Sequence, residues 1–245
     1  MSNVKLSVVT VTYNAENLVE DTIKSVIEQD FSDMEYIVID GKSTDRTLDI
    51  INHYASCIQT IVSEPDRGIF DAMNKALRFV KGEWVYFLNA GDLFASSNVL
   101  KSIPWKNLDN KIAFYGDMIY VRGSNEKFRQ SRPVSVLHVS MPASHPAFCV
   151  KSAAAKKIGF DLQYKYASDY NMMLRLITTH GDASFAHIPL TIAKYEAEEG
   201  FSSRYPNDVF GEVIAIRSHI KKDIVWHWDL MKYKLKKRLH YKSCR

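Results

Sequence analysis

The sequence predicts an α/β fold in which a mixed, mostly parallel sheet is flanked by helices and followed by a basic helical tail. Two patterns predict it. Short apolar segments rich in β-branched residues alternate with longer amphipathic segments over residues 5–88, which is typical of a parallel sheet with right-handed crossovers. Residues 217–245 hold ten Lys or Arg and only two Asp, whereas the rest of the chain is mildly acidic.

The first half of the chain contains the clearest elements. Its predicted strands lie at residues 5–12, 36–40, 57–62 and 84–88. The intervening segments have apolar side chains at helical spacing, which predicts helices at residues 16–28, 43–54 and 68–80. The second of these helices opens with a Ser, Thr and Asp cluster that is suited to capping.

The second half is less regular. Its predicted elements are a strand, a helix and a second strand, at residues 112–121, 168–181 and 183–195. We expect Ser168 to cap the helix and Pro189 to break the last strand. Residues 124–147 carry polar side chains and three prolines, so we expect a loop there. From about residue 207 onward we expect helix.

Composition limits the class of protein. The chain has 245 residues, 46% apolar and 24% charged, which suits a globular protein with a substantial core. No apolar run approaches the roughly 18–20 residues of a membrane-spanning helix, and the N-terminus lacks the signal-peptide pattern. Cys57, Cys149 and Cys244 are widely spaced and form neither a disulfide framework nor a metal-binding pattern. We therefore expect a cytoplasmic, reduced protein.

Polar side chains follow three of the predicted strands where the strands end, at residues 12–14, 40–43 and 89–92. Because the carboxyl ends of parallel strands share one edge of a sheet, we expect the three clusters to converge at a ligand site. Each cluster also has a simpler interpretation. Asn14 and Ser43 suit the caps of the helices that follow, and Asp40 with Gly41 suits a turn.

The residues at these strand ends are suited to a nucleotide base. No G-x-G-x-x-G or Walker-type lysine motif follows the first strand, which counts against a dinucleotide-binding dehydrogenase and a P-loop enzyme. Tyr13 can stack on a base, and Asp40 can accept a hydrogen bond from a base N–H. The helix at residues 68–80 adds Asp71 and Asn74 on one face.

The start of that helix is a candidate phosphate contact. Helix N-termini favour anions, and Arg67 lies just ahead of the helix. The alternative is that Asp71 lies near the helix start because it complements the helix dipole.

Six longer segments extend these patterns. They read SVVTVTYNAENLVEDTIKSVIEQDF, YIVIDGKSTDRT, SEPDRGIFDAMNKAL, GEWVYFLNAGD, SHPAFCVKSAAAKKIGFD and YASDYNMMLRL. Over about half of the chain, they resemble family-2 glycosyltransferases, which are inverting enzymes with the Rossmann-like GT-A fold. SEPDRGIFDAMNK and NAGD look most like the subgroup that builds bacterial exopolysaccharide, colanic-acid-type or O-antigen units.

The resemblance implies a UDP- or GDP-linked sugar donor. Tyr13 and Asp40–Gly41 match the positions that hold the nucleoside, although many relatives carry a second Asp where this chain has Gly41. We interpret residues 1–206 as one GT-A domain, with a donor-binding half at 1–95 and an acceptor half at 96–206. The candidate donor-binding residues are Thr12, Tyr13, Asn14, Asp40, Arg67, Asp71, Asn74, Asn89 and Gly91.

The resemblance also implies a divalent cation, Mn²⁺ or Mg²⁺, at residues 89–92. The family motif there is usually Asp-x-Asp followed by another Asp, and this chain has Asn89, Gly91 and Asp92. One carboxylate can suffice, because such cations keep water and phosphate oxygens as ligands. We expect Asp92, with His145 beside it, to hold the cation. The alternative is a site that depends less on metal, with Arg67, helix dipoles and His145 sharing the phosphate charge.

An inverting transfer needs a base for the acceptor hydroxyl. The family places this carboxylate in the motif matched by ASDYN, so Asp169 is the candidate base. From the residues alone, Asp169 reads as a first-turn acid behind a Ser168 cap.

The basic segment at residues 207–245 mixes lysines with Trp, Leu and Ile. Such a segment suits peripheral contact with the anionic inner face of a membrane, where it would meet a lipid-linked saccharide acceptor. The alternative is a terminal helix that packs on the domain. Nucleic-acid binding is not expected, because the basic charge is confined to the tail.

Two other functions fit part of these observations. A sugar-1-phosphate nucleotidyltransferase can share this kind of sheet, but its glycine-rich, basic N-terminal loop is absent. A degenerate family member that binds donor or partners without transferring sugar would fit the reduced metal motif. The sequence does not identify the sugar, the acceptor or the linkage.

Overall fold

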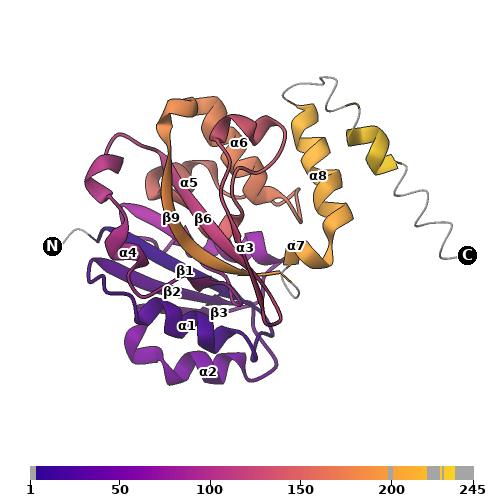
Figure 1. The fold of residues 1–245 in the computed structure, drawn as a ribbon. Helices are drawn as coiled ribbons and strands as arrows, with labels where there is room; N and C mark the ends of the chain where they lie inside the picture. Colours follow the sequence, from indigo (N-terminus) through magenta and orange to yellow (C-terminus); the bar gives the residue numbers. More distant parts are fainter. Residues whose placement is uncertain (1–3, 198–200, 220–226, 228, 235–245) are drawn as a thin grey trace, which may run out of the picture.

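The protein has a central curled sheet with helices on both faces (Figure 1). The structure is a computed structural model and describes residues 4–197, 201–219, 227 and 229–234. Within these residues the strand order is β3-β2-β1-β4-β8-β6-β9-β5, with β7 paired to β6. The strands are β1 Leu6–Thr12, β2 Met34–Asp40, β3 Thr60–Ser63, β4 Trp84–Phe87, β5 Leu93–Phe94, β6 Ala113–Arg122, β7 Asn125–Arg129, β8 Phe148–Lys151 and β9 Phe185–Glu196. The predicted α/β fold is confirmed.

The N-terminal half of the sheet is parallel. β1 lies between β2 and β4, with Thr12 opposite Asp40 and Val9 opposite Phe87. The chain after β4 continues along β1, because the N–H of Ala90 donates to the carbonyl of Val11 at 3.2 Å. The ends of these three strands therefore lie at one edge, as predicted from their order along the chain.

Helices cover both faces of this sheet because side chains along each strand alternate in direction. Along β1, Leu6 and Val8 belong to one buried cluster, and Val9 and Val11 belong to the other. The first cluster packs against α1 Val19–Ile27, α2 Thr47–His53 and α4 Val99–Ser102. The second packs against α3 Ile69–Ala76, α5 Ser152–Ile158 and α6 Ser168–His180.

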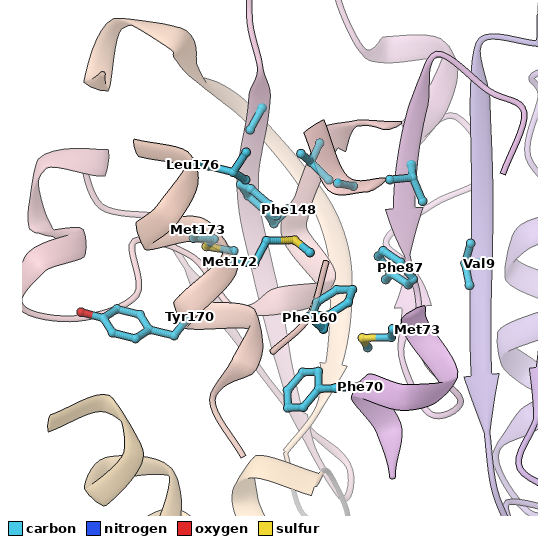
Figure 2. Packing of buried hydrophobic residues seen from close by; sticks show 14 of the residues in the cluster. Val9, Phe70, Met73, Phe87, Phe148, Phe160, Tyr170, Met172, Met173 and Leu176 are labelled. Carbon is cyan, nitrogen blue, oxygen red and sulfur yellow. The ribbon is translucent and has the colours of Figure 1, made fainter. Parts of the chain in front are cut away.

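The second core joins α3 to the rest of the domain. Figure 2 shows Phe70 and Met73 of α3 beside Phe87 of β4 and Phe160. The rings of Phe70 and Phe160 stack with centroids 5.6 Å apart, and Phe87 meets Phe160 edge-on at 5.3 Å. Burying each such side chain contributes about 1.5–3 kcal/mol. This packing fixes the start of α3 at the edge where the strands end.

Three predictions of local structure are wrong. The strand expected at residues 57–62 begins only at Thr60, because Ala55–Cys57 form a 3₁₀ turn, η1. Ser168 does not cap α6, because it is the first helical residue and its hydroxyl has no hydrogen-bond partner. β9 continues past Pro189, and a bulge absorbs the proline: Tyr115 pairs with His187, but Asp117 pairs with Thr191.

Residues 124–147 are not wholly a loop, because they include all of β7. The turn between β6 and β7 contains Gly123 with φ of 53°, which favours glycine, and β7 is exposed along its whole length. The remaining segment holds two 3₁₀ turns, η3 Val134–His138 and η4 His145–Ala147. β8 and α5 have no counterpart among the predicted elements.

The described C-terminal part is helical, in agreement with the prediction from residue 207. α7 Phe201–Arg204 precedes α8 Pro206–Ser218, which lies beside α6 (Figure 1). Arg217 of α8 is 3% exposed and forms an ion pair with Asp229 at 2.8 Å. No helix in the described ranges is both long and apolar enough to span a membrane. About half of the segment predicted to contact membrane, residues 220–226, 228 and 235–245, lies outside those ranges.

Candidate functional site

A cavity of about 400 Å³ lies at the carboxyl ends of β1 and β4 and reaches across to α6. This volume falls within the usual range of ligand pockets. The structure brings eight of the predicted site residues into its lining: Thr12, Tyr13, Asn14, Asn89, Gly91, Asp92, His145 and Asp169. Asp40, Arg67, Asp71 and Asn74 are not part of that lining.

The loops after β1 and β2 are hydrogen-bonded to each other. The N–H of Asn14 donates to the hydroxyl of Ser43 at 2.9 Å, and the N–H of Thr44 donates to the Asn14 side chain at 2.9 Å. Neither Asn14 nor Ser43 caps the next helix. Asn14 has φ of 47°, a conformation that Asn tolerates. Tyr13 lies next to these hydrogen-bonded residues and lines the cavity, with 61% of its surface exposed.

Two carboxylates lie near this end of the cavity, and they have different environments. Asp40 is fully buried, and it accepts hydrogen bonds from the Ser63 hydroxyl at 2.6 Å and the Ser43 N–H at 3.1 Å. Asp66 lines the cavity instead. A Cβ added at Gly41 would lie 2.5 Å from Asp66 Oδ2 and 3.3 Å from the Tyr13 ring. The missing side chain of Gly41 therefore leaves room for the Asp66 carboxylate beside Tyr13.

The residues around α3 make mainly structural contacts. The side chain of Arg67 is 77% exposed and pairs with Asp71 at 3.4 Å. Asp71 also accepts from the backbone N–H of Arg67 at 3.0 Å, which holds the start of the helix. Asn74 accepts from the N–H of Phe160 and donates to its carbonyl, both at 2.8 Å. These contacts join α3 to the loop before α6.

The segment at residues 89–92 turns sharply beside α1. Gly91 has φ of 100°, which favours glycine. Its N–H donates to the Thr22 hydroxyl at 2.9 Å, and that hydroxyl donates to the Asp92 carbonyl at 2.9 Å. Asp92 is 7% exposed, and burial raises the pKa of its carboxyl to about 8. The side-chain oxygen of Asn89 is buried with no hydrogen-bond partner.

His145 and Asp169 meet at the other side of the cavity. Nδ1 of His145 lies 3.9 Å from Oδ2 of Asp169. Burial raises the pKa of Asp169, and the nearby His145 opposes that shift in part. Burial lowers the pKa of His145, and neither ring nitrogen has a hydrogen-bond partner. The arrangement contains a carboxylate that can accept a proton next to a neutral imidazole.

The donor set fits a divalent cation that is shared with a diphosphate. Asp92 supplies one carboxylate, and the unpartnered atoms of Asn89 and His145 line the same cavity. No group of three or more His, Cys, Asp or Glu in the described ranges would hold a metal with protein ligands alone. A cation there would need phosphate and water oxygens to complete its shell.

Several other lining residues were not among the predicted site residues. They are Tyr166, Tyr195, Glu196, Arg204 and Tyr205, together with Asp66. Glu196 ends β9. Burial raises the pKa of Asp92, and a hydrogen bond with the backbone of Glu196 offsets part of that rise. Asp66 and Tyr166 lie within motifs noted in the sequence. The other four come from the last strand, from α7 and from the start of α8, which have no local signature.

The chain belongs to glycosyl transferase family 2, because the model of that family matches residues 7–171, more than half of the chain. This confirms the family inferred from the sequence motifs. A PGL/p-HBAD biosynthesis glycosyltransferase of Mycobacterium bovis is 25% identical over 203 residues, which cover 80% of this chain and 78% of the relative.

Solved structures show the same fold. A mannosyltransferase from Pyrobaculum calidifontis in complex with GDP-Man and Mn²⁺ matches with a TM-score of 0.71 and 19% identity, over 94% of this chain and 73% of that one. The S. aureus TarS 1–349 structure in complex with UDP-GlcNAc matches with a TM-score of 0.69 and 20% identity, over 94% and 71%. The chain spans 42% of the longer TarS chain. The GT-A fold is therefore the fold of this protein.

Asp92 makes the stability of the cation-free protein depend on pH. Its pKa is about 8 when folded and 3.8 as a free side chain, so the folded state binds the extra proton between these values. The free energy of unfolding should then fall by about 1.4 kcal/mol per pH unit as pH rises through this window. We expect the thermal midpoint to drop from pH 5 to pH 8 in chelator, and Asp92→Asn to reduce that drop.

The matched control for this measurement is Asp109→Asn, which changes an exposed carboxyl. It should keep the full drop in thermal midpoint. An equal drop in the Asp92→Asn variant would show that Asp92 ionises normally in the folded protein.

Proposed function

We propose that this protein transfers a sugar, with inversion, from a nucleotide-diphosphate donor to a hydroxyl of a saccharide acceptor. The main observation is that one cavity contains an exposed aromatic ring, a glycine turn with a buried carboxylate, and a second carboxylate with a raised pKa. These are Tyr13, Gly91 with Asp92, and Asp169. They come from distant parts of the chain. In the proposed reaction, the first two features bind the donor, and the second carboxylate accepts the acceptor proton.

The donor nucleoside lies at the Tyr13 end in this proposal. The ring stacks on the base, and Asp66 accepts from a base or ribose donor beside it. Asp40 supports the donor site indirectly, because its hydrogen bonds with Ser43 and Ser63 hold the loop that carries the site. The GDP-Man and UDP-GlcNAc in the two solved structures support a nucleotide-diphosphate donor.

The diphosphate lies over residues 89–92. Gly91 carries no side chain, so the diphosphate can approach the backbone. Asp92, with Asn89 and His145 nearby, holds a Mn²⁺ or Mg²⁺ ion. When bound, such an ion neutralises charge on the leaving diphosphate. The Mn²⁺ in the mannosyltransferase structure supports this assignment.

Asp169 accepts the proton of the acceptor hydroxyl. The hydroxyl oxygen attacks the anomeric carbon and forms the new glycosidic bond, while the bond from that carbon to the diphosphate breaks on the opposite face. The electron pair leaves with the nucleoside diphosphate. The raised pKa of Asp169 improves it as a base, as long as the carboxyl is ionised at the working pH.

We infer that the acceptor is a lipid-linked saccharide in cell-surface polysaccharide synthesis. The basic composition of residues 217–245 supports this, because such a segment is attracted to anionic membrane surfaces. The tail then acts as a peripheral membrane contact on the inner face of the cell membrane.

A nucleotide-sugar panel tests the donor. Binding to the folded state raises the thermal midpoint by mass action. We expect one UDP- or GDP-sugar to raise the midpoint with Mn²⁺ or Mg²⁺ present, and to raise it less in chelator. A donor at a hundred times its Kd stabilises the fold by about 2.7 kcal/mol.

The matched free sugar is the control, and it should not change the midpoint. If no nucleotide sugar changes it with either cation, the donor assignment is wrong and the non-transferring alternative is favoured.

A further inference from the structure

A second cavity of about 350 Å³ is lined by residues close to those of the candidate site. It is lined by β6, β7 and the following loop up to Ser144. The next residue, His145, lines the candidate site and lies 3.9 Å from Asp169. The linings of the two cavities are therefore neighbours: Ser144 and His145 are consecutive, and the rings of Tyr120 in one lining and Tyr195 in the other have centroids 5.3 Å apart.

The lining of this second cavity is cationic. It includes Arg129 and Arg132 and no Asp or Glu. In the described part of the chain, no carboxylate lies within ion-pair distance of either guanidinium. The acid closest in the hydrogen-bond network is Asp117, which accepts from the Ser131 N–H at 2.9 Å and pairs with His187 at 3.0 Å. The positive charge of the cavity therefore has no anionic partner from these residues.

Both arginines are exposed, and each has a contact with the protein that restrains its guanidinium group. Nη2 of Arg132 donates to the Ser140 hydroxyl at 2.7 Å and to the Met141 carbonyl at 2.8 Å. Its other guanidinium N–H groups have no acceptor among the described residues. The guanidinium of Arg129 lies 5.2 Å from the ring centroid of Tyr120, whose hydroxyl is 2.5 Å from the Ser144 hydroxyl. Positioned guanidinium groups lose less entropy when they bind an anion.

We propose that this cavity binds the phosphate or diphosphate group of the acceptor. Arginine forks match phosphate oxygens with two parallel hydrogen bonds, and the hydroxyls of Ser140 and Ser144 add neutral donors. An anion held beside Ser144 leaves the saccharide of the same molecule to extend past His145 toward Asp169. This inference rests on the proposed function, because it assigns part of the acceptor of that reaction.

The first test uses pyrophosphate alone, measured by calorimetry in chelator. We expect the Arg129→Gln, Arg132→Gln double variant to bind pyrophosphate at least about tenfold more weakly than the wild type, which corresponds to about 1.4 kcal/mol. The matched control is Lys127→Gln, an exposed residue on β7 that is not part of the lining. It should bind pyrophosphate like the wild type.

The second arm identifies the source of the phosphate. Phosphatidylcholine vesicles with and without a polyprenyl phosphate are sedimented with wild type and double variant. If the wild type binds more to vesicles that contain polyprenyl phosphate, and the double variant does not, the anion belongs to a lipid. Pyrophosphate binding that needs the arginines, without a vesicle effect, assigns it to a soluble phosphorylated saccharide.

Equal pyrophosphate affinity in wild type and double variant would overturn the proposal, as would no binding by either. Arg129→Gln alone provides a second variant, because it removes a charge without removing the hydrogen bonds of Arg132. It should also weaken binding. The nucleotide-sugar panel is repeated on the double variant, and we expect its donor response to be unchanged. A donor response in both proteins with equal pyrophosphate binding rejects only this inference, whereas no donor response in either rejects the proposed function.

Discussion

We expect Asp169→Asn to remove sugar transfer while it leaves donor binding nearly unchanged. The substitution keeps the size of the side chain but removes the oxygen that would accept the proton of the acceptor hydroxyl. Loss of a general base typically lowers kcat by about 10²–10⁴-fold. Because burial opposes ionisation of this carboxyl, the neutral amide should fold at least as stably. The measurement is transfer to acceptor, with the donor-induced thermal shift recorded in parallel.

The pH profile separates a base from a structural acid. Asp169 must be ionised to act, so wild-type kcat/KM should fall as pH is lowered through its raised pKa. The residual activity of Asp169→Asn should not show that decrease at low pH. Asp182→Asn, an exposed acid just beyond α6, is the matched control and should keep both rate and profile. Unchanged turnover in Asp169→Asn would mean that another group takes the proton.

The parallel half of the fold could be predicted because local patterns determine it. Strands such as Leu6–Thr12 are short, apolar and followed by amphipathic helices, and the crossover rule then places their ends together. Once those ends converge, the polar residues after each strand have to lie at one edge. The convergence of Thr12, Asp40 and Asn89 therefore follows from chain order and sheet handedness.

Which carboxylate faces the cavity could not be predicted in the same way. Asp40 ends a predicted strand and Asp66 lies two residues ahead of a predicted helix, so the two acids look equivalent in sequence. The difference arises from contacts between segments: Ser43 and Ser63 occupy the oxygens of Asp40, and Gly41 leaves space for Asp66. Such contacts depend on strand register and on the absence of a side chain at Gly41. Neither feature produces a periodic pattern in the sequence.

The other half of the sheet, where β8 is antiparallel to both of its neighbours, was harder to predict for a similar reason. β8 has only four residues, and it pairs with both β4 and β6, which lie far from it in sequence. Local propensity says little about such a strand, because its pairing partners determine it. Three lining residues, Glu196, Arg204 and Tyr205, likewise join the site only after β9 has been placed in the sheet.

The C-terminal helix supplies the second large expected effect, through Glu212 of α8. Its carboxylate accepts three backbone N–H groups in the loop that leads into α6: those of Lys165 at 2.8 Å, Tyr166 at 2.8 Å and Ala167 at 2.9 Å. Asp169 follows two residues later, so the geometry of the proposed base depends on this contact. Hydrogen bonds to charged groups contribute about 1.5–3 kcal/mol each.

We therefore expect Glu212→Ala to lower the free energy of unfolding by about 2–4 kcal/mol, because water replaces only part of the three bonds. We also expect kcat to fall more than tenfold with a smaller change in donor KM, because loss of the contact misplaces Asp169 but leaves Tyr13 and Asp92 in position. Chemical denaturation and steady-state kinetics measure the two effects.

Rescue by a conservative change distinguishes positioning from general destabilisation. Glu212→Gln keeps one acceptor oxygen, which can turn toward the paired N–H groups of Tyr166 and Ala167, so it should recover part of kcat. Asp208→Asn, an exposed acid on the same helix, should behave like the wild type. If Glu212→Ala loses stability but keeps kcat at a temperature where it is fully folded, the contact holds α8 in place without positioning Asp169. If kcat falls and Glu212→Gln restores it, the helix that begins the basic segment also sets the geometry of the proposed base.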